Sequence, residues 1–205
     1  MTAALLTAVQ VYKAGLVELQ TIVQKTETAI VSESSQDLLV SANVNFFAKS
    51  FLISICAHLE MCIKDIIFTV ATELDRRLSL ASIPTTFIEW RYSQKKKMES
   101  PGQQIQPAGI GMTRKEIDEL VSGNVYRTKD ALALVGVELS ADKAAWESWK
   151  EMIQSMVTKR NNIVHHNDAA SDLSLGDIRQ YISLTMNYID FIVGACTSNT
   201  SGAEA

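Results

Sequence analysis

An all-α fold is predicted by three features of the 205-residue sequence. Apolar residues recur at helical rather than alternating spacing over most of the chain, which favours amphipathic helices over strands. Only three prolines and nine glycines interrupt that pattern. Apolar residues make up 47% of the chain, which is enough for one sizeable core, so we expect a single globular unit.

The first part of the chain is predicted to form two long helices. Apolar residues at helical spacing define the first one over residues 3–30. The polar segment SESSQD follows, in which Ser34 with Asp37 three residues later resembles a capping box. This box would open a second helix over residues 37–80. That helix is apolar on nearly every face, which is typical of the centre of a bundle.

Residues 51–70 are apolar enough to raise the question of a membrane span. His58, Glu60, Lys64 and Asp65 lie in the middle of this run. Each charged residue there would cost about 2.5 to 3.5 kcal/mol on insertion into a bilayer. We therefore expect a core helix and no association with a membrane, with His58 as a hydrogen-bonded core residue.

Residues 83–113 break the helical pattern. All three prolines and three glycines fall here, so we expect a long irregular insertion. Its segment WRYSQKKK interleaves aromatic rings with cations, a pattern that suits stacking on bases and contact with RNA phosphates. The alternative is a solvated lysine-rich loop. In the first interpretation the RNA-binding residues are Arg91, Lys95, Lys96 and Lys97.

The rest of the chain is predicted to form four more helices. They are expected over residues 113–122, over residues 126–138, from about Ser140 onward, and after Ser174. Thr113 with Glu116 three residues later forms a capping box for the first of them. The final segment, TSNTSGAEA, has too little apolar content to pack. We therefore expect one helical domain over residues 1–196 and a disordered tail over residues 197–205.

Composition and motifs restrict the chemistry. The net charge of −4 gives no global attraction to nucleic acid, so any RNA site must be built from local cations. Cys56, Cys62 and Cys196 lie in apolar runs without metal-binding spacing, which indicates buried reduced thiols in a cytoplasmic protein. No GxxxxGK[ST], GxSxG or HExxH motif occurs. We expect neither a metal nor a cofactor.

Arg160 occupies an unusual position in the helix that begins near Ser140. At about 100° per residue, Arg160 lies only about 20° from Ile153 around the helix axis. Five other apolar residues fall within about 60° of Ile153: Trp146, Trp149, Met156, Val157 and Val164. A guanidinium in an apolar stripe needs an anion or an open interface, because it does not readily lose its charge.

Asn161 and two histidines follow Arg160 at the end of the same helix. Asn161 and His165 are four residues apart and about 40° from each other, so they share one edge of the helix. His166 points away from Arg160 by roughly 120°. His165 is therefore the better candidate for a site. The alternative is structural: Arg160 would pair with Glu60 or another carboxylate, and the histidines would interact with the C-terminal end of the helix.

The segment RNNIVH resembles the R-x(4-6)-H motif of the HEPN superfamily, in which a polar residue, often asparagine, follows the arginine. The order of the surrounding elements is also similar. An apolar helix with the segment KSFLISICAHLEMCIKDII comes first, then variable elements, then the motif at a helix end and one more amphipathic helix. Over residues 37–193 this arrangement resembles the RiboL-PSP-HEPN and related toxin-like branches. The resemblance implies an antiparallel helical bundle.

The resemblance also implies an activity. Many HEPN domains are metal-independent endoribonucleases of defence and toxin–antitoxin systems, and they dimerise so that two motifs meet. By this resemblance Arg160 and His165 would be catalytic, supported by Asn161, with Glu60 and His166 as further supporting residues. The implied partners are an RNA substrate, a second copy of the chain, and a cognate antitoxin or defence-system protein. The alternative is a non-catalytic HEPN-like binding module that acts as an antitoxin or assembly partner.

Two features depart from this pattern or compete with it. Glu60 is four residues from Lys64, so an ion pair within one helix is the alternative to a place beside Arg160. Some HEPN toxins carry a tyrosine two residues after the histidine, which a partner nucleotidyltransferase modifies. Asn167 occupies that position here, so neutralisation by that route is not implied.

Overall fold

The computed structural model describes residues 2–31, 38–92, 111–166 and 172–201. Within these ranges every regular element is a helix, which confirms the predicted all-α class. The predicted capping box at Ser34 and Asp37 lies outside the described residues.

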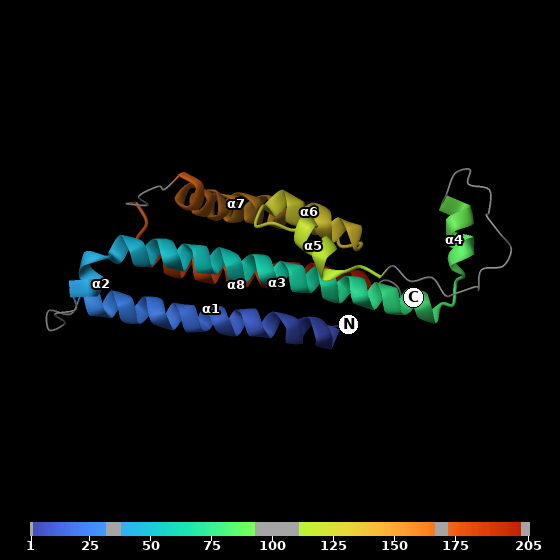
Figure 1. Ribbon diagram of the computed structural model, residues 1–205, viewed down its shortest axis with the longest axis horizontal. Helices are drawn as coiled ribbons and strands as arrows, with labels where there is room; N and C mark the ends of the chain where they lie inside the picture. The colour runs from blue at the N-terminus through green and yellow to red at the C-terminus, as the bar shows by residue number, and fades with distance from the viewer. Residues whose placement is uncertain (1, 32–37, 93–110, 167–171, 202–205) are drawn as a thin grey trace.

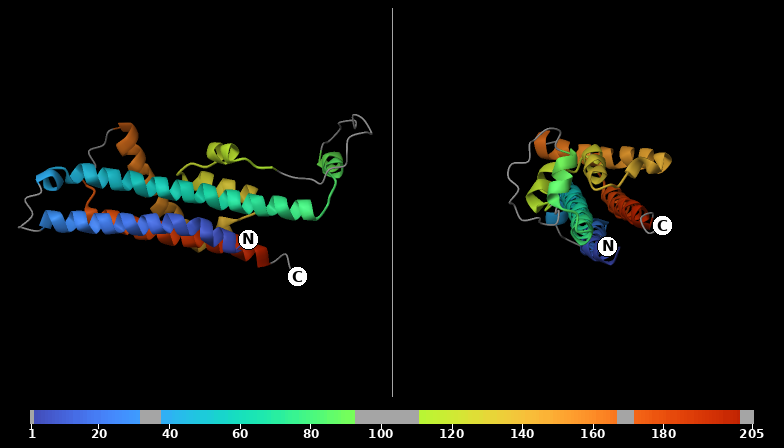
Figure 2. Two further views of the ribbon diagram at one scale, coloured as in Figure 1. Left: turned by 60° about the horizontal axis from the view of Figure 1, so that its bottom comes forward. Right: turned by 90° about the vertical axis from the view of Figure 1, so that its right-hand side faces the viewer.

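Four long helices form an antiparallel bundle. They are α1 (Thr2–Val31), α3 (Val44–Leu80), α7 (Lys143–His166) and α8 (Leu175–Ser201). Figure 1 shows α1 running opposite to α3 and α7 running opposite to α8, with α7 on the other side of α3 from α1. The helices α1, α3 and α8 pack against one another, as the end-on view in Figure 2 shows. No described helix is long and apolar enough to cross a membrane.

The central helix α3 is buried along two sides because apolar residues surround most of its circumference. Its fully buried side chains include Leu52, Ile55, Leu59, Ile63 and Ile66. Glu60 and Lys64 of the same helix lie on the remaining face, toward α5 (Arg114–Leu120) and α7. This division leaves a charged seam at the surface above an apolar core.

The second predicted helix is in fact two. Leu38–Ala42 forms the short helix α2, and the chain then breaks at Asn43, which has φ −123° and ψ 24°. The Asn43 side-chain amide donates a hydrogen bond to the Leu39 carbonyl at 2.8 Å. Asparagine competes with the helix for backbone hydrogen bonds in this way, which explains the break.

The segment predicted to be irregular contains a helix. Residues Thr85–Tyr92 form α4, which stands beyond the end of α3 in Figure 1. Its first turn is closed by Phe87 and Ile88, whose amides donate to the Pro84 carbonyl. A proline just before the first turn is compatible with a helix because its missing N–H would have no partner there. Residues 93–110, including Lys95, Lys96 and Lys97, lie outside the described residues.

The connecting helices α5 and α6 (Val125–Leu134) are held by side-chain caps. Thr113 and Glu116 form the predicted capping box, in which the Glu116 carboxylate also accepts the Thr113 amide at 2.7 Å. Asn124 caps α6 by accepting two backbone amides. The helix α6 ends earlier than predicted, because Gly136 with φ 79° turns the chain before the 3₁₀ helix η1 (Leu139–Ala141).

The last helix begins after Ser174, as predicted. Ser174 and Asp177 cap it reciprocally: the Ser174 amide donates to the Asp177 carboxylate at 2.8 Å, and the Asp177 amide donates to Ser174 Oγ at 3.0 Å. The prediction of a disordered tail from residue 197 is wrong for residues 197–201, which continue α8. The hydroxyls of Thr197 and Ser198 donate to carbonyls one turn earlier, so these polar residues fit the exposed end of a helix.

Candidate functional site at the seam between α3 and α7

Arg160 lies where α7 crosses the charged face of α3. Its side chain is only 23% exposed, and its Nη2 lies 3.6 Å from Glu60 Oε2 on α3. Its Nη1 donates a hydrogen bond to Asn161 Oδ1 at 2.9 Å. The apolar stripe of α7 thus carries this guanidinium to a carboxylate, and both the predicted neighbours, Glu60 and Asn161, are brought to it.

Glu60 belongs to a longer chain of charges. Its other oxygen, Oε1, lies 2.9 Å from Lys64 Nζ, so the predicted pairing within α3 is also present. Lys64 reaches Asp118 on α5 at 3.1 Å. Burial acts to lower the pKa of Lys64, but the hydrogen bonds that it donates to the carboxylates of Glu60 and Asp118 raise that pKa overall. Charges of alternating sign therefore connect α5 to Arg160 across α3.

Buried apolar residues and thiols lie beneath this chain. Cys56, one turn before Glu60, is buried, and burial raises the pKa of its thiol to about 11, although the nearby Arg160 acts in the opposite direction. Burial likewise raises the pKa of Cys62 and of Cys196 to about 12. The three cysteines are buried free thiols, as predicted. At neutral pH they are protonated and poor nucleophiles.

The two histidines lie at the exposed end of α7. His165 and His166 are both in its last turn, and both are exposed. His165 is the fifth residue after Arg160, which places the two about 140° apart around an ideal helix. None of the contacts among described residues joins either histidine to Arg160. Within one copy, Asn161 accepts a hydrogen bond from Arg160, although it shares a helix edge with His165.

One residue of the predicted apolar face of α7 is misplaced. Val164 is 49% exposed, whereas Ile163 is buried. Val164 is consequently an exposed apolar residue beside the histidines.

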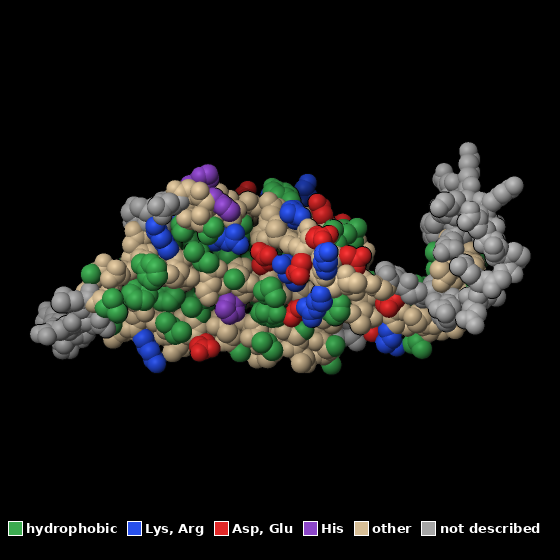
Figure 3. Space-filling model, in the orientation of Figure 1, with side chains coloured by type: hydrophobic (Ala, Val, Ile, Leu, Met, Phe, Trp, Pro, Cys, Tyr) green, Lys and Arg blue, Asp and Glu red, His purple; other side chains and the backbone are tan. Residues whose placement is uncertain are grey.

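Further exposed apolar side chains lie on the neighbouring part of α3. Phe46 is 66% exposed, and Ile53 and Met61 are also exposed. These residues recur at spacings of seven and eight, so they occupy one stripe of the helix. Figure 3 shows hydrophobic side chains gathered over this half of α3, with histidine at the end of α7 above them. We call Phe46, Ile53, Met61 and Val164 the apolar rim.

Among the predicted RNA-binding residues, only Arg91 lies in a described element, and that element is not at this seam. Arg91 is in α4, which lies beyond the far end of α3 from the histidines (Figure 1). His58, singled out as a core residue, is half-buried, and its Nδ1 is 2.8 Å from the Ser54 carbonyl. Because a carbonyl only accepts, Nδ1 carries the proton in this contact. In the part of the chain that the structure describes, no cluster of side chains has the composition of a metal site.

A sequence model of the RiboL-PSP-HEPN family matches residues 18–198, which is most of the chain. The chain belongs to the RiboL-PSP-HEPN family. The match includes the second half of α1, all of α3 and α7 with the seam between them, and most of α8. HEPN domains commonly dimerise and bind RNA, and many members of the superfamily are ribonucleases. No curated protein and no solved structure matches the chain.

Asp118 is a residue of this site that has no signal in the sequence. It lies in the middle of the capped helix α5, where an acidic residue is an ordinary solvent-exposed choice. Its importance depends on how α5 docks on α3, through the ion pair of Arg114 with Asp65 and the packing of Arg114 on the Phe68 ring. No local sequence pattern predicts that α5 packs on α3 in this way, so the role of Asp118 could not be predicted.

Proposed function

We propose that this HEPN domain is a metal-independent endoribonuclease of a defence or toxin–antitoxin type, with its active site where two copies meet. The observation that carries the proposal is the position of Arg160: a guanidinium that is held at the surface of the seam, at the arginine of the R-x(4-6)-H motif. Two of its five N–H groups face Asn161 and Glu60, which leaves others to bind phosphate oxygens.

The proposed reaction needs three chemical groups. A base removes the proton of the 2′-hydroxyl, a cation stabilises the charge that develops on the phosphorane, and an acid protonates the leaving 5′-oxygen. Histidine suits the proton transfers because it titrates near neutral pH, and arginine suits the phosphorane because its fork matches phosphate oxygens. Asn161 and Glu60 would fix the direction of the guanidinium.

The separation of Arg160 from His165 within one copy favours a composite site. The apolar rim borders the seam, and a second copy seated on it would bury four exposed apolar side chains. Such a two-fold arrangement would bring the partner subunit's His165 toward Arg160. The partners in this proposal are an RNA substrate and a second copy, with a cognate antitoxin or defence protein as the regulator.

The binding-module alternative has an observation in its favour. Arg160 is already paired with Glu60 and Asn161, as in a purely structural network. In that case the chain would bind a partner without turnover, as an antitoxin or assembly component. Substitution of Arg160 would then change stability or association without loss of any cleavage.

The deciding experiment is incubation of the purified protein with mixed RNAs in the presence of a chelator, followed by end-group analysis. The proposal expects 2′,3′-cyclic phosphate and 5′-hydroxyl ends for the wild type and none for Arg160→Ala. Arg179→Ala is a matched control, because Arg179 also pairs with a carboxylate, at 3.4 Å, on the surface of α8 and α1. Cleavage that survives in Arg160→Ala, or that requires magnesium, would contradict the proposal.

The histidines provide a second test of the same site. His165→Ala should lower the cleavage rate by roughly 10²- to 10⁴-fold, as for a general acid or base, while the fold is retained. His166→Ala should lower it much less. Equal losses of cleavage rate in His165→Ala and His166→Ala would contradict the assignment of His165 as the catalytic histidine. A composite site would be excluded if light scattering showed only monomer.

The cations of the insertion are proposed to contribute affinity rather than chemistry. Replacing Lys95, Lys96 and Lys97 together should weaken RNA binding and flatten its dependence on salt. An unchanged salt dependence would favour the solvated loop instead.

A further inference from the structure

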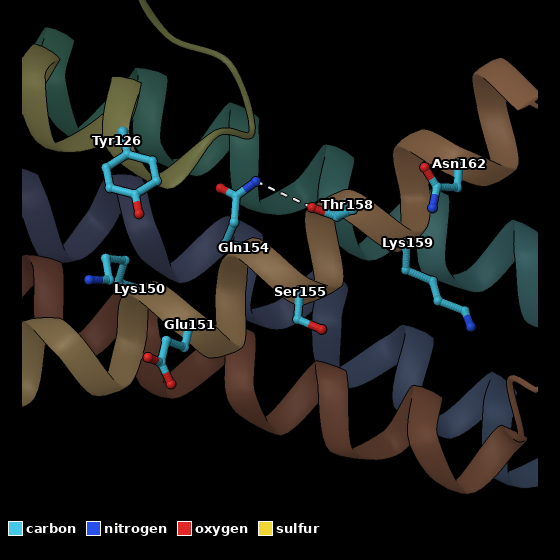
Figure 4. A pocket seen from close by; sticks show the side chains of 8 residues that line it. All are labelled: Tyr126, Lys150, Glu151, Gln154, Ser155, Thr158, Lys159 and Asn162. Atoms are coloured by element: carbon cyan, nitrogen blue, oxygen red, sulfur yellow. Dashed lines mark hydrogen bonds between the residues drawn. The ribbon is translucent and has the colours of Figure 1, made fainter.

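A shallow groove of about 460 Å³ runs along the outer face of α7. Figure 4 shows Tyr126 of α6 and Lys150 at one end, and Lys159 and Asn162 at the other. The lining residues of α7 follow one another at spacings of three and four, so they form one continuous strip of the helix. This strip faces away from the core.

The residues that line the groove are polar or aromatic, and one of them, Glu151, is acidic. Between the two ends lie the hydroxyls of Ser155 and Thr158 and the amide of Gln154, which donates to Thr158 Oγ1 at 3.3 Å. The Gln154 carbonyl oxygen is buried and accepts no hydrogen bond from any described residue. An apolar ligand would find no pocket of Leu, Ile or Val here, whereas hydroxyls and amides match the edges of bases.

Tyr126 supplies a surface for stacking. It lies in the first turn of α6, which Asn124 caps, so its backbone is held in place. Its side chain is nevertheless 51% exposed beside the groove. An exposed aromatic ring next to lysines is the combination with which proteins bind single-stranded nucleic acid, because every base has a face that stacks.

Both lysines of the groove are ion-paired, and the side chain of each is 21% exposed. Lys150 pairs with Glu147, and Lys159 pairs with Asp172, whose side chain is 71% exposed. Surface ion pairs of this kind contribute at most about 1 kcal/mol, so a phosphate can replace the carboxylate. The lysines are nine residues apart on α7, about 13.5 Å along the helix axis, which accommodates about four stacked nucleotides at roughly 3.4 Å each.

The groove leads directly to the motif. Asn162 at its end is followed by His165 and His166 at three and four residues, the spacing of neighbours on one side of a helix. A strand that lies in the groove is therefore directed toward the histidines of α7. A duplex does not offer unstacked bases to Tyr126, so the groove would select a single strand.

We propose that the groove on α7 binds a single-stranded segment of RNA, with one base stacked on Tyr126 and phosphates on Lys150 and Lys159. This inference rests on the proposed function, because it places the substrate strand beside the cleavage site. It adds a subsite on the opposite side of α7 from Arg160 and assigns it a preference for unpaired RNA.

The test is fluorescence anisotropy of a short labelled single-stranded RNA with the full chain in the His165→Ala background, in which the proposed function predicts cleavage that is slower by roughly 10²- to 10⁴-fold. Tyr126→Ala should weaken binding about 5- to 100-fold, as expected for loss of one stacked base, and Tyr126→Phe should bind nearly as the parent does. Circular dichroism of each variant establishes that the fold is retained.

The lysines are tested by salt dependence. Replacing Lys150 and Lys159 by glutamine should lower the slope of log K against log salt by about 1.4, since each phosphate contact to a single strand contributes roughly 0.7. Lys115→Gln is the matched control, because Lys115 is an exposed lysine of α5 outside the groove. A duplex of the same sequence should respond to none of the Tyr126 variants.

The inference is overturned if Tyr126→Ala binds single-stranded RNA as the parent does, or if Tyr126→Ala and Tyr126→Phe lose affinity equally. Cleavage that depends on Arg160 but not on Tyr126 would leave the proposed function intact and remove only the groove. Absence of any RNA binding or cleavage by the wild type would remove both.

Discussion

Replacing Glu60 by glutamine removes a carboxylate that faces both Lys64 and Arg160. At an effective dielectric constant of about 20, charges 3.6 Å and 2.9 Å apart attract by about 5 to 6 kcal/mol each, which is an upper bound. Glu60 is 24% exposed, so solvent screens much of this attraction, and exposed pairs contribute only about 1 kcal/mol. Breaking buried pairs removes about 3 to 5 kcal/mol. For this half-buried carboxylate we expect a loss of about 2 kcal/mol in the free energy of unfolding.

The assay is thermal and urea denaturation followed by circular dichroism, at one fixed protein concentration because association would shift the midpoint. A loss of about 2 kcal/mol corresponds to a fall in Tm of about 4 to 8 °C for a chain of this length. Glu18→Gln is the control, since Glu18 is an exposed carboxylate of α1. A double-mutant cycle with Arg160→Met should give a coupling of about 1 kcal/mol between Glu60 and Arg160.

Additive effects of Glu60→Gln and Arg160→Met would refute the reasoning. They would mean that the two side chains do not interact in solution, and that Glu60 cannot hold the guanidinium for a phosphate. If a double-mutant cycle showed coupling between Glu60 and Lys64 but none between Glu60 and Arg160, the role of Glu60 would be confined to an ion pair within α3.

Three further perturbations test the packing and the charges of the bundle. An added Cβ at Gly15 would lie 2.7 Å from His58 Nε2, so Gly15→Ala should lower the urea midpoint. In a His58→Ala background, Gly15→Ala should instead raise the free energy of unfolding by about 1 kcal/mol, because alanine favours the helix. A change in stability of the same sign in both backgrounds would refute this contact. The hydroxyl of Tyr188 is buried and has no hydrogen-bond partner among the described residues. Tyr188→Phe should therefore leave the free energy of unfolding unchanged or raise it by up to about 1 kcal/mol. A loss of more than about 1 kcal/mol would show that the hydroxyl has a partner. Hydrogen bonds that Arg76 and Arg77 donate to Glu73 lower the pKa of its carboxyl group from the ordinary value of 4.5 to about 2. Stability from this depressed pKa is present above pH 4.5 and is lost as the pH falls toward 2, so Glu73→Gln should lower Tm at neutral pH and show a smaller fall in Tm over that acid range; an unchanged acid profile would contradict the ion pairs.

Helical periodicity predicts much of the seam. The wheel of α7 places Arg160 on the face that meets α3, and the charged residues of α3 can only lie where that helix is not covered by apolar neighbours. A contact between Glu60 and Arg160 is therefore a reasonable expectation from the sequence alone. The position of His165 is harder to predict. Its angle around the helix is close to that of Asn161, but it is about 140° from that of Arg160.

The remaining features depend on interactions that a linear pattern does not contain. The break at Asn43 comes from a single side-chain hydrogen bond inside a segment that otherwise has the pattern of one helix. The place of Asp118 depends on the docking of α5, and the groove depends on Tyr126 from α6 reaching the outer face of α7. The prolines of residues 83–113 correctly predict that α3 ends before this segment. They also led us to predict no helix there, although α4 lies between two of them.

The length of α3 has a consequence for the size of the RNA. From Glu60 to Leu80 the helix runs 20 residues, about 30 Å, before the chain turns into α4. That span equals about nine stacked nucleotides at roughly 3.4 Å each. If α4 contacts the same RNA strand that we propose is cut beside Arg160, then the length of α3 sets the shortest RNA that reaches both places. Oligonucleotides shorter than about nine nucleotides would then be cut without contact to α4.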